Sequence, residues 1–308
     1  MRWLLPGLLV GCHAANVAVD SQPPPPAMPP AAASPAPVAI ASIDAGSPEG
    51  PPYDLAADRE RRLALARTEL GSKTTSAVVA DMFVVVGPPG GNFGASLSLM
   101  RSAMTGFMND RFAEKPAEAI TVYLLPDASS YEAICRKKYG AACIAHFGFY
   151  QPGDRSMVMN IGLGVGTLTH ELVHPLVEAN FPDAPTWLNE GIASVFEQPV
   201  IPRPGEIHGA KNWRLPRLRA GLAAHELRLE QLFTLSDDAF RADHEDLHYA
   251  AARYVCQWLD ERGKLWPFFQ RWRTTHATDA SGARTFTDVV GMTPEDAHAV
   301  WAKWVAAL

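Results

Sequence analysis

Two histidines and a glutamate in one short run have the types and spacing of a metal site. The run His170-Glu171-Leu172-Val173-His174 has the pattern H-E-x-x-H. On a helix, positions i and i+4 share one face, so the two imidazoles would converge on one metal ion. Glu171 is turned by about 100° from His170, so its carboxylate could reach a water at that ion. The apolar residues around the run favour a buried helix over two solvent-facing histidines.

A catalytic zinc site needs a third protein ligand and one open position. The run Trp187-Leu188-Asn189-Glu190-Gly191 follows the second histidine, His174, after a proline-containing turn. A second helix that begins near Trp187 would present Glu190 back towards the two histidines. Glu190 is therefore the candidate for the third ligand.

The H-E-L-V-H run, the turn at 181–185 and the W-L-N-E-G run together resemble the gluzincin metallopeptidases, and especially the small bacterial peptidase MA-like families. The specific match covers about residues 167–197, and a weaker pattern extends it over most of residues 75–308. The resemblance implies an α+β, zincin-like metallopeptidase fold. It also implies that His170, His174 and Glu190 bind Zn²⁺, and that Glu171 is the general base and later the proton shuttle. Zinc lowers the pKa of bound water from ~15.7 towards ~7, so a nearby carboxylate can complete its deprotonation.

The same resemblance implies a Tyr or His on a later helix that donates to the negative oxygen formed on the substrate. The candidates are Tyr249 and His248, and Tyr249 is preferred because it opens a segment similar to the family's Tyr-Ala helix. Tyr254 falls on another helical face and is expected in the core. The strand before the metal-binding helix, within residues 147–160, would form the rim of the substrate cleft.

Two residues depart from the family pattern. Pro175 directly follows the second histidine and lacks the N–H that would pair with the carbonyl of Glu171, so the helix should kink or loosen there. Thermolysin-like enzymes place an acid four residues after the third ligand, where it orients a zinc-bound histidine, but here that position is Ser194. Another acid, Glu197 or Asp183, must substitute, or the site is weakened.

Hydrophobic periodicity predicts the elements that position these residues. We expect helices at 58–70, 97–112 and 129–139, a long helix from about Gly166, and later helices at 187–197, 248–262, 264–274 and 294–307. We expect strands at 78–86 and 120–125 and a hairpin over 147–159. Strands and helices mix in the first half and helices dominate the second, which is an α+β order. The catalytic domain is predicted at 57–308, with an α+β subdomain at 57–186 and a helical one at 187–308.

The N-terminus reads as an export signal and a spacer. One positive residue, a short apolar run and Leu9-Val10-Gly11-Cys12 resemble a bacterial lipoprotein signal peptide at 1–11, which would place a lipid on Cys12. The Pro- and Ala-rich segment 12–56 is predicted to be a disordered tether. We therefore expect an extracytoplasmic protein, lipid-anchored to a bacterial membrane at the outer membrane or periplasm.

Composition excludes several classes of protein. A net charge of -6 and a pI near 5.9 argue against nucleic-acid binding, and the chain has no apolar run long enough for a polytopic membrane protein. Cys135 and Cys143 are spaced to close a small disulfide loop in an oxidising compartment, and Cys256 is expected to be a buried free thiol.

The sequence thus predicts a zinc-dependent metallopeptidase that acts on a peptide or protein substrate. Two alternatives use the same residues. One is a catalytically inactive, zinc-containing surface binding module, and the other is a non-peptidase amide hydrolase.

Overall fold

The computed structural model describes residues 53–308. The predicted signal peptide, the lipid-bearing Cys12 and all but the last four residues of the predicted tether lie outside the described residues. No helix within 53–308 is both long enough and apolar enough to cross a bilayer. The first helix, α1 (Leu55–Leu70), begins three residues before the predicted Asp58 because the Asp54 side chain caps its free N–H groups.

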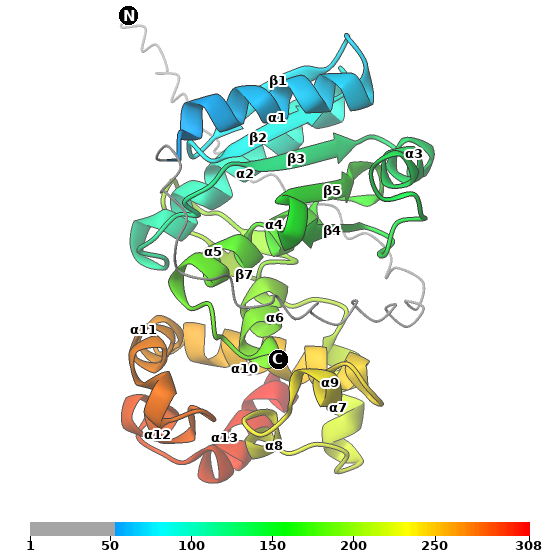
Figure 1. The fold of residues 1–308 in the computed structure, drawn as a ribbon. Coiled ribbons are helices and arrows are strands. Elements are labelled where there is room, and N and C mark those ends of the chain that lie inside the picture. The colour runs from blue at the N-terminus through cyan, green and yellow to red at the C-terminus, as the bar shows by residue number, and fades with distance from the viewer. Residues whose placement is uncertain (1–52) are drawn as a thin grey trace, which may run out of the picture. The chain divides into compact units, whose positions relative to one another are not determined.

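A mixed five-stranded sheet lies in the first half of the described chain (Figure 1). Its strands are β1 (Thr75–Val79), β2 (Phe83–Gly87), β3 (Ile120–Leu125), β4 (Gly148–Gln151) and β5 (Ser156–Asn160). Their order across the sheet is β1-β2-β3-β5-β4. The three central strands β2, β3 and β5 are parallel, and antiparallel β1 and β4 form the two edges. The strand at 120–125 and the hairpin predicted over 147–159 are confirmed, and the 3₁₀ turn Pro152–Asp154 joins β4 to β5.

Helices cover both faces of the sheet, so the central strands are apolar on both sides. Side chains alternate along β2, where Phe83 and Val85 enter the larger core while Val84 and Val86 enter the smaller one. Helices α1 and α3 (Ala128–Tyr139) pack over the smaller core, and α2 (Gly91–Asp110) and α4 (Gly166–Glu171) pack on the other face. The α+β class is therefore confirmed.

The prediction of one strand over 78–86 is wrong, because the chain turns back in the middle of this segment. β1 and β2 are two antiparallel strands, joined at Ala80 and Asp81 in the left-handed region at φ 52° and 70°. Glycine would be the usual residue at such positions, so the sequence carries no turn signal. Contacts from other segments stabilise the turn, since Arg59 donates to the Asp81 carbonyl and Lys115 pairs with the Asp81 carboxylate at 3.2 Å.

The predicted long helix from Gly166 is divided into two. α4 ends at Glu171 and α5 (Val173–Asn180) begins after Leu172. Pro175 has no N–H for the carbonyl of Glu171 and its ring occupies that space, so the regular hydrogen-bond ladder is interrupted one turn before the proline. The loosening of the helix expected from Pro175 is thus confirmed as an interruption at Leu172, and it falls between the two histidines of the motif.

The second half of the chain is almost wholly helical and follows the turn after α5 (Figure 1). Its helices are α6 (Thr186–Val195), α7 (Leu215–Ala223), α8 (Leu229–Leu232), α9 (Asp237–Phe240), α10 (Glu245–Asp260), α11 (Leu265–Thr275), α12 (Ala283–Val290) and α13 (Pro294–Ala307). The short strands β6 (Pro199–Val200) and β7 (His208–Gly209) and the 3₁₀ turns Ile161–Leu163 and His276–Thr278 complete the described elements. The four helices predicted here are confirmed as α6, α10, α11 and α13, whereas α7, α8, α9 and α12 were missed.

Helices α6 and α10 pack against each other along most of the length of α6. Gly191 permits this close approach, because a Cβ there would lie 2.8 Å from both the Ala252 carbonyl oxygen and the Cys256 sulfur. Tyr254 and Cys256 on α10 are fully buried, and the thiol is free, as predicted. The packing fixes the position of α6, the helix that carries Glu190.

The predicted disulfide between Cys135 and Cys143 is present. It ties the C-terminal half of α3 to the loop that leads into the edge strand β4. Tyr131 on α3 donates to the carbonyl of Ala145 in the same loop at 2.6 Å. The start of β4 is therefore fixed at two points.

Asp58 connects α1 to Arg155, which lies directly before β5. Its buried carboxylate accepts hydrogen bonds from Tyr53 at 2.8 Å, Arg62 at 3.2 Å and Arg155 at 3.1 Å. Burial alone would raise the pKa of Asp58, but these hydrogen bonds and the two positive charges outweigh burial and hold the pKa below its usual range. The carboxylate is therefore ionised at neutral pH and anchors the first helix.

Candidate metal centre

The structure brings the three predicted ligands together. His170 comes from α4, His174 from α5 and Glu190 from α6, and their ligand atoms all lie within 4.8 Å of one another. Glu190 Oε2 lies 3.3 Å from His170 Nε2 and 4.0 Å from His174 Nε2. Both imidazoles lie on one side despite the break at Leu172, with ring centroids 4.9 Å apart. Two imidazole nitrogens and one carboxylate oxygen are a donor set that suits zinc.

Each histidine has a polar partner at Nδ1, which leaves Nε2 on the side of the candidate metal site. His174 Nδ1 lies 2.9 Å from the side-chain oxygen of Asn189, and an amide oxygen can only accept, so Nδ1 carries the hydrogen. His170 Nδ1 is buried and lies 3.5 Å from Glu197 Oε1, too far for a well-formed hydrogen bond. Asn189 thus orients the His174 ring by a hydrogen bond, as outer partners of metal-binding histidines commonly do, and Glu197 places a negative charge beside Nδ1 of His170.

Of the two acids considered to replace the missing one, the structure places Glu197 behind His170. Asp183 is exposed in the turn before α6, and Ser194 is fully buried with no hydrogen-bond partner for its hydroxyl among the described residues. Glu197 lies just beyond the end of α6. Its carboxylate therefore reaches the histidine from beyond the helix rather than from within it.

Glu197 is itself held by an ion pair that no pattern in the sequence indicates. Arg214 donates Nη2 to Glu197 Oε1 at 2.7 Å and Nε to Oε2 at 3.0 Å, which is a two-point guanidinium–carboxylate contact. The Asn212 amide adds a third hydrogen bond at 2.7 Å. Burial would raise the pKa of Glu197, but Arg214 and His170 hold it well below its usual range, so the carboxylate stays charged.

The two oxygens of Glu190 have separate partners. Oε2 faces the histidines, while Oε1 accepts a hydrogen bond from Arg241 Nη2 at 3.0 Å. Burial opposes ionisation of Glu190, but the nearby His174, His170 and Arg241 hold its pKa well below the usual range. Burial likewise opposes protonation of His170, but Glu190 and Glu197 raise its pKa to about 10, so a metal bound at Nε2 would have to displace a proton. Glu190 is thus oriented to offer one oxygen to a metal.

Glu171 lies beside the three candidate ligands and is buried. Its Oε2 accepts a hydrogen bond from the backbone N–H of Tyr150 on β4 at 2.9 Å and lies 3.8 Å from His174 Nε2. Burial is the largest effect on this carboxyl and raises its pKa, although the two histidines and the N–H of Tyr150 act in the opposite direction. A carboxylate with a raised pKa is suited to accept a proton near neutral pH.

The two candidate donors on α10 have different surroundings. The hydroxyl of Tyr249 accepts a hydrogen bond from Arg241 Nη1 at 3.0 Å, so Arg241 connects it to Glu190. Burial is the main reason that the pKa of Tyr249 lies well above its usual value, and the hydroxyl keeps its proton. His248 Nδ1 instead pairs with the carbonyl of Phe240 at 3.0 Å, at the end of α9.

Two arginines of the site were missed because neither has a local signal. Arg214 and Arg241 lie 17 and 51 residues beyond Glu197 and Glu190, the acids that they contact. In the sequence each is one of many arginines in polar segments. Only the packing of the loops after α6 brings them to the candidate centre.

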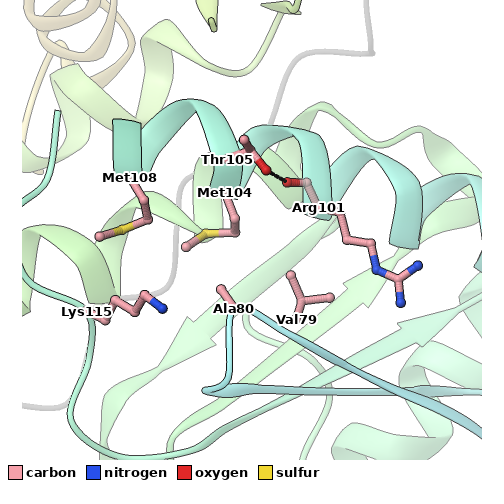
Figure 2. Close-up of a pocket in the computed structure, with 7 residues that line it drawn as sticks. All are labelled: Val79, Ala80, Arg101, Met104, Thr105, Met108 and Lys115. Atoms are coloured by element: carbon pink, nitrogen blue, oxygen red, sulfur yellow. Dashed lines mark hydrogen bonds between the residues drawn. The ribbon is translucent and has the colours of Figure 1, made fainter. Parts of the chain in front are cut away.

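An open groove of about 260 Å³ lies apart from this centre, between α2 and the turn that joins β1 to β2. In Figure 2, Met104 and Met108 extend from α2 towards the turn, and Lys115 and Arg101 lie at opposite ends. Its lining consists of Val79, Ala80, Arg101, Met104, Thr105, Met108 and Lys115. None of these belongs to the helices that carry the candidate ligands.

No protein-family model matches this chain, and no curated protein matches it in sequence. What can be inferred about its activity therefore depends on the residues and geometry of the candidate centre.

Proposed function

We propose that this protein is a zinc-dependent metallopeptidase of the gluzincin type, with a zincin-like fold. The observation that carries the proposal is the convergence of His170, His174 and Glu190 beside a buried carboxylate, Glu171. The edge strand β4 next to α4 and the helical second half, which supplies Glu190, support the zincin-like arrangement.

A zinc ion bound by the three ligands would supply a Lewis acid that polarises a carbonyl and lowers the pKa of a water to near neutrality. Glu171 is the proton carrier in this proposal. Because Oε2 already accepts the N–H of Tyr150, Oε1 is the atom available to take the proton of the attacking water. Glu171 then passes that proton to the leaving nitrogen. Tyr249 is the proposed donor to the substrate oxygen, because its ionisation is disfavoured and its O–H hydrogen is not used by Arg241.

The edge strand β4 is the proposed rim of the substrate cleft. Among residues 53–308 it pairs with β5 alone, so its outer edge can pair with an extended peptide. The N–H of Tyr150 is already used by Glu171, so a substrate strand would pair with other backbone groups of β4. A peptide or protein is therefore the proposed substrate.

The proposed location is extracytoplasmic, with a lipid on Cys12 that anchors the protein to a bacterial membrane. The disulfide between Cys135 and Cys143 supports an oxidising compartment, because such bonds are rare where thiols are kept reduced. The anchor itself rests on the sequence around Cys12.

The test compares the wild-type protein with Glu171→Gln on a library of peptides, with bound zinc measured in both. We expect the glutamine variant to keep its zinc and to lose about 10²–10⁴-fold in cleavage rate, the usual contribution of a general base. Glu226→Gln is the matched control, because it makes the same chemical change on an exposed acid that pairs with Arg217.

Equal cleavage by wild type and Glu171→Gln would contradict the proposal. If both bind zinc and neither cleaves peptides, simple amides separate the two alternatives. Turnover of amides by the wild type alone would indicate a non-peptidase amide hydrolase, and no turnover would indicate a zinc-containing binding module.

A further inference from the structure

Arg241 faces the candidate centre from a segment that carries no motif. It follows α9 directly, and its guanidinium contacts both Tyr249 and Glu190 at 3.0 Å. Only the width of the Glu190 carboxylate separates it from the oxygen that faces the histidines. A group bound by Arg241 would therefore lie next to the metal ligands.

The Arg241 guanidinium has N–H groups that make no hydrogen bond within residues 53–308. A guanidinium carries five N–H groups, and within residues 53–308 one bonds Tyr249 and one bonds Glu190. The side chain of Arg241 is 41% exposed, whereas Arg214 behind His170 is 14% exposed and holds Glu197 at two points. Arg241 is thus the cation of the centre that a substrate can reach.

Tyr249 also has a hydrogen that it can donate to a substrate. Arg241 can only donate, so the Tyr249 oxygen accepts and its own hydrogen remains to be donated. Within the described residues this hydroxyl has no acceptor. A charged and a neutral donor therefore lie side by side at one edge of the centre.

The segment that carries Arg241 is fixed at both ends. Asp237, at the start of α9, accepts the backbone N–H of Thr186 at 3.1 Å, which attaches α9 to the start of α6. Phe240, the last residue of α9, is attached to α10 through the contact between its carbonyl and His248 Nδ1. Donors held in this way need little reorganisation when charge develops on a substrate, and such donors contribute strongly to catalysis.

We propose that Arg241 is a further catalytic residue, which donates with Tyr249 to the substrate oxygen on which negative charge develops during hydrolysis. This inference rests on the proposed function. Its contribution comes from a positive charge beside a developing negative one in a partly desolvated site. Loss of one such donor commonly lowers kcat about 10²–10³-fold.

The test measures binding of a probe as well as turnover. The probe is a tripeptide in which a phosphinate replaces one peptide bond, because its charged tetrahedral group imitates the proposed state. Binding to the zinc-loaded full chain is measured by calorimetry in wild type, Arg241→Gln and Arg241→Lys, with zinc affinity measured by chelator competition. Arg217→Gln is the matched control, because Arg217 makes exposed ion pairs with Glu226 and Asp246.

We expect Arg241→Gln to weaken probe binding at least tenfold at saturating zinc, Arg241→Lys to weaken it less, and Arg217→Gln to leave it unchanged. On a cleaved peptide, the glutamine variant should lower kcat with little change in KM. Unchanged probe binding, or no binding by the wild type, overturns the role of Arg241. A defect that disappears at saturating zinc also overturns it, because Arg241 would then only position Glu190.

A probe with an amidated C-terminus separates one more case. If Arg241→Gln weakens only the probe with a free C-terminal carboxylate, Arg241 binds that carboxylate and the proposed role is wrong. These readouts do not require turnover. A wild type that binds the probe with the expected dependence on Arg241 and cleaves no peptide would contradict the proposed peptidase activity alone.

Discussion

Replacing Glu197 by glutamine should weaken zinc binding and destabilise the fold, and the two effects have different causes. The carboxylate lies 3.5 Å from His170 Nδ1, and its negative charge favours the ring orientation that leaves Nε2 for the metal. Loss of such an outer partner typically lowers metal affinity 10–100-fold, which is about 1.4–2.7 kcal/mol.

The loss of stability has its origin at Arg214. The Arg214 and Glu197 side chains are 14% and 6% exposed, so the variant leaves a nearly buried guanidinium without its carboxylate. Removing one partner of a buried ion pair costs about 3–5 kcal/mol, and we expect the lower end because glutamine still offers one acceptor oxygen.

The two effects can be separated by a second variant, Glu197→Gln with Arg214→Met. An apolar side chain in place of the buried charge should recover much of the free energy of unfolding, while zinc affinity stays low. Urea unfolding of the zinc-free protein measures stability, and chelator competition measures affinity. Glu226→Gln is the control, since its partly exposed ion pair contributes about 0–1 kcal/mol. A zinc affinity for Glu197→Gln within twofold of wild type would refute this account of the His170 environment.

Three further predictions concern the scaffold and are each measured by urea unfolding. Asp58→Asn should lower stability by about 1–3 kcal/mol at pH 7, where the low pKa of Asp58 keeps its ion pairs intact. The difference should shrink as the pH falls below about 4, because Asp58 then takes up a proton in the unfolded chain and, at lower pH, in the folded protein. A deficit that stays constant down to pH 2 would argue against the ion pairs. Replacing Cys135 and Cys143 by serine should cost about 2–3 kcal/mol through loop-closure entropy, and reductant should lower wild-type stability equally. Gly191→Ala should cost about 1–3 kcal/mol because its Cβ meets α10, and added Cys256→Ala should recover only part, since the backbone carbonyl of Ala252 still obstructs it.

The candidate ligands could be selected from the sequence because their spacing is set by local geometry. His170 and His174 share a helical face at i and i+4, and the structure keeps them on one side even though the helix is divided between them. The division was itself predictable, because the effect of Pro175 on its own helix depends only on covalent structure. The choice of Glu190 also required that a second helix pack beside the histidines, and the structure places Glu190 next to them.

Features that depend on contacts between distant segments could not be predicted from the sequence. The turn at Ala80 and Asp81 is stabilised by Arg59 and Lys115 from other elements, so an apolar run that looked like one strand forms two. Glu197 could be named only as one of two acids, because its role depends on the end of α6 and on Arg214. Arg241 has no local pattern and is positioned by α9, a four-residue helix that periodicity does not reveal.

The central claim is that His170, His174 and Glu190 bind one zinc ion, and metal stoichiometry tests it most directly. The purified full chain is loaded with zinc, passed through a desalting column and analysed for metal, next to His174→Ala, Glu190→Ala and the control Glu226→Gln. We predict one zinc per chain in wild type and control, and little or none in the two ligand variants at the same folded fraction. A wild type that retains no zinc, or ligand variants that retain as much as wild type, would contradict it.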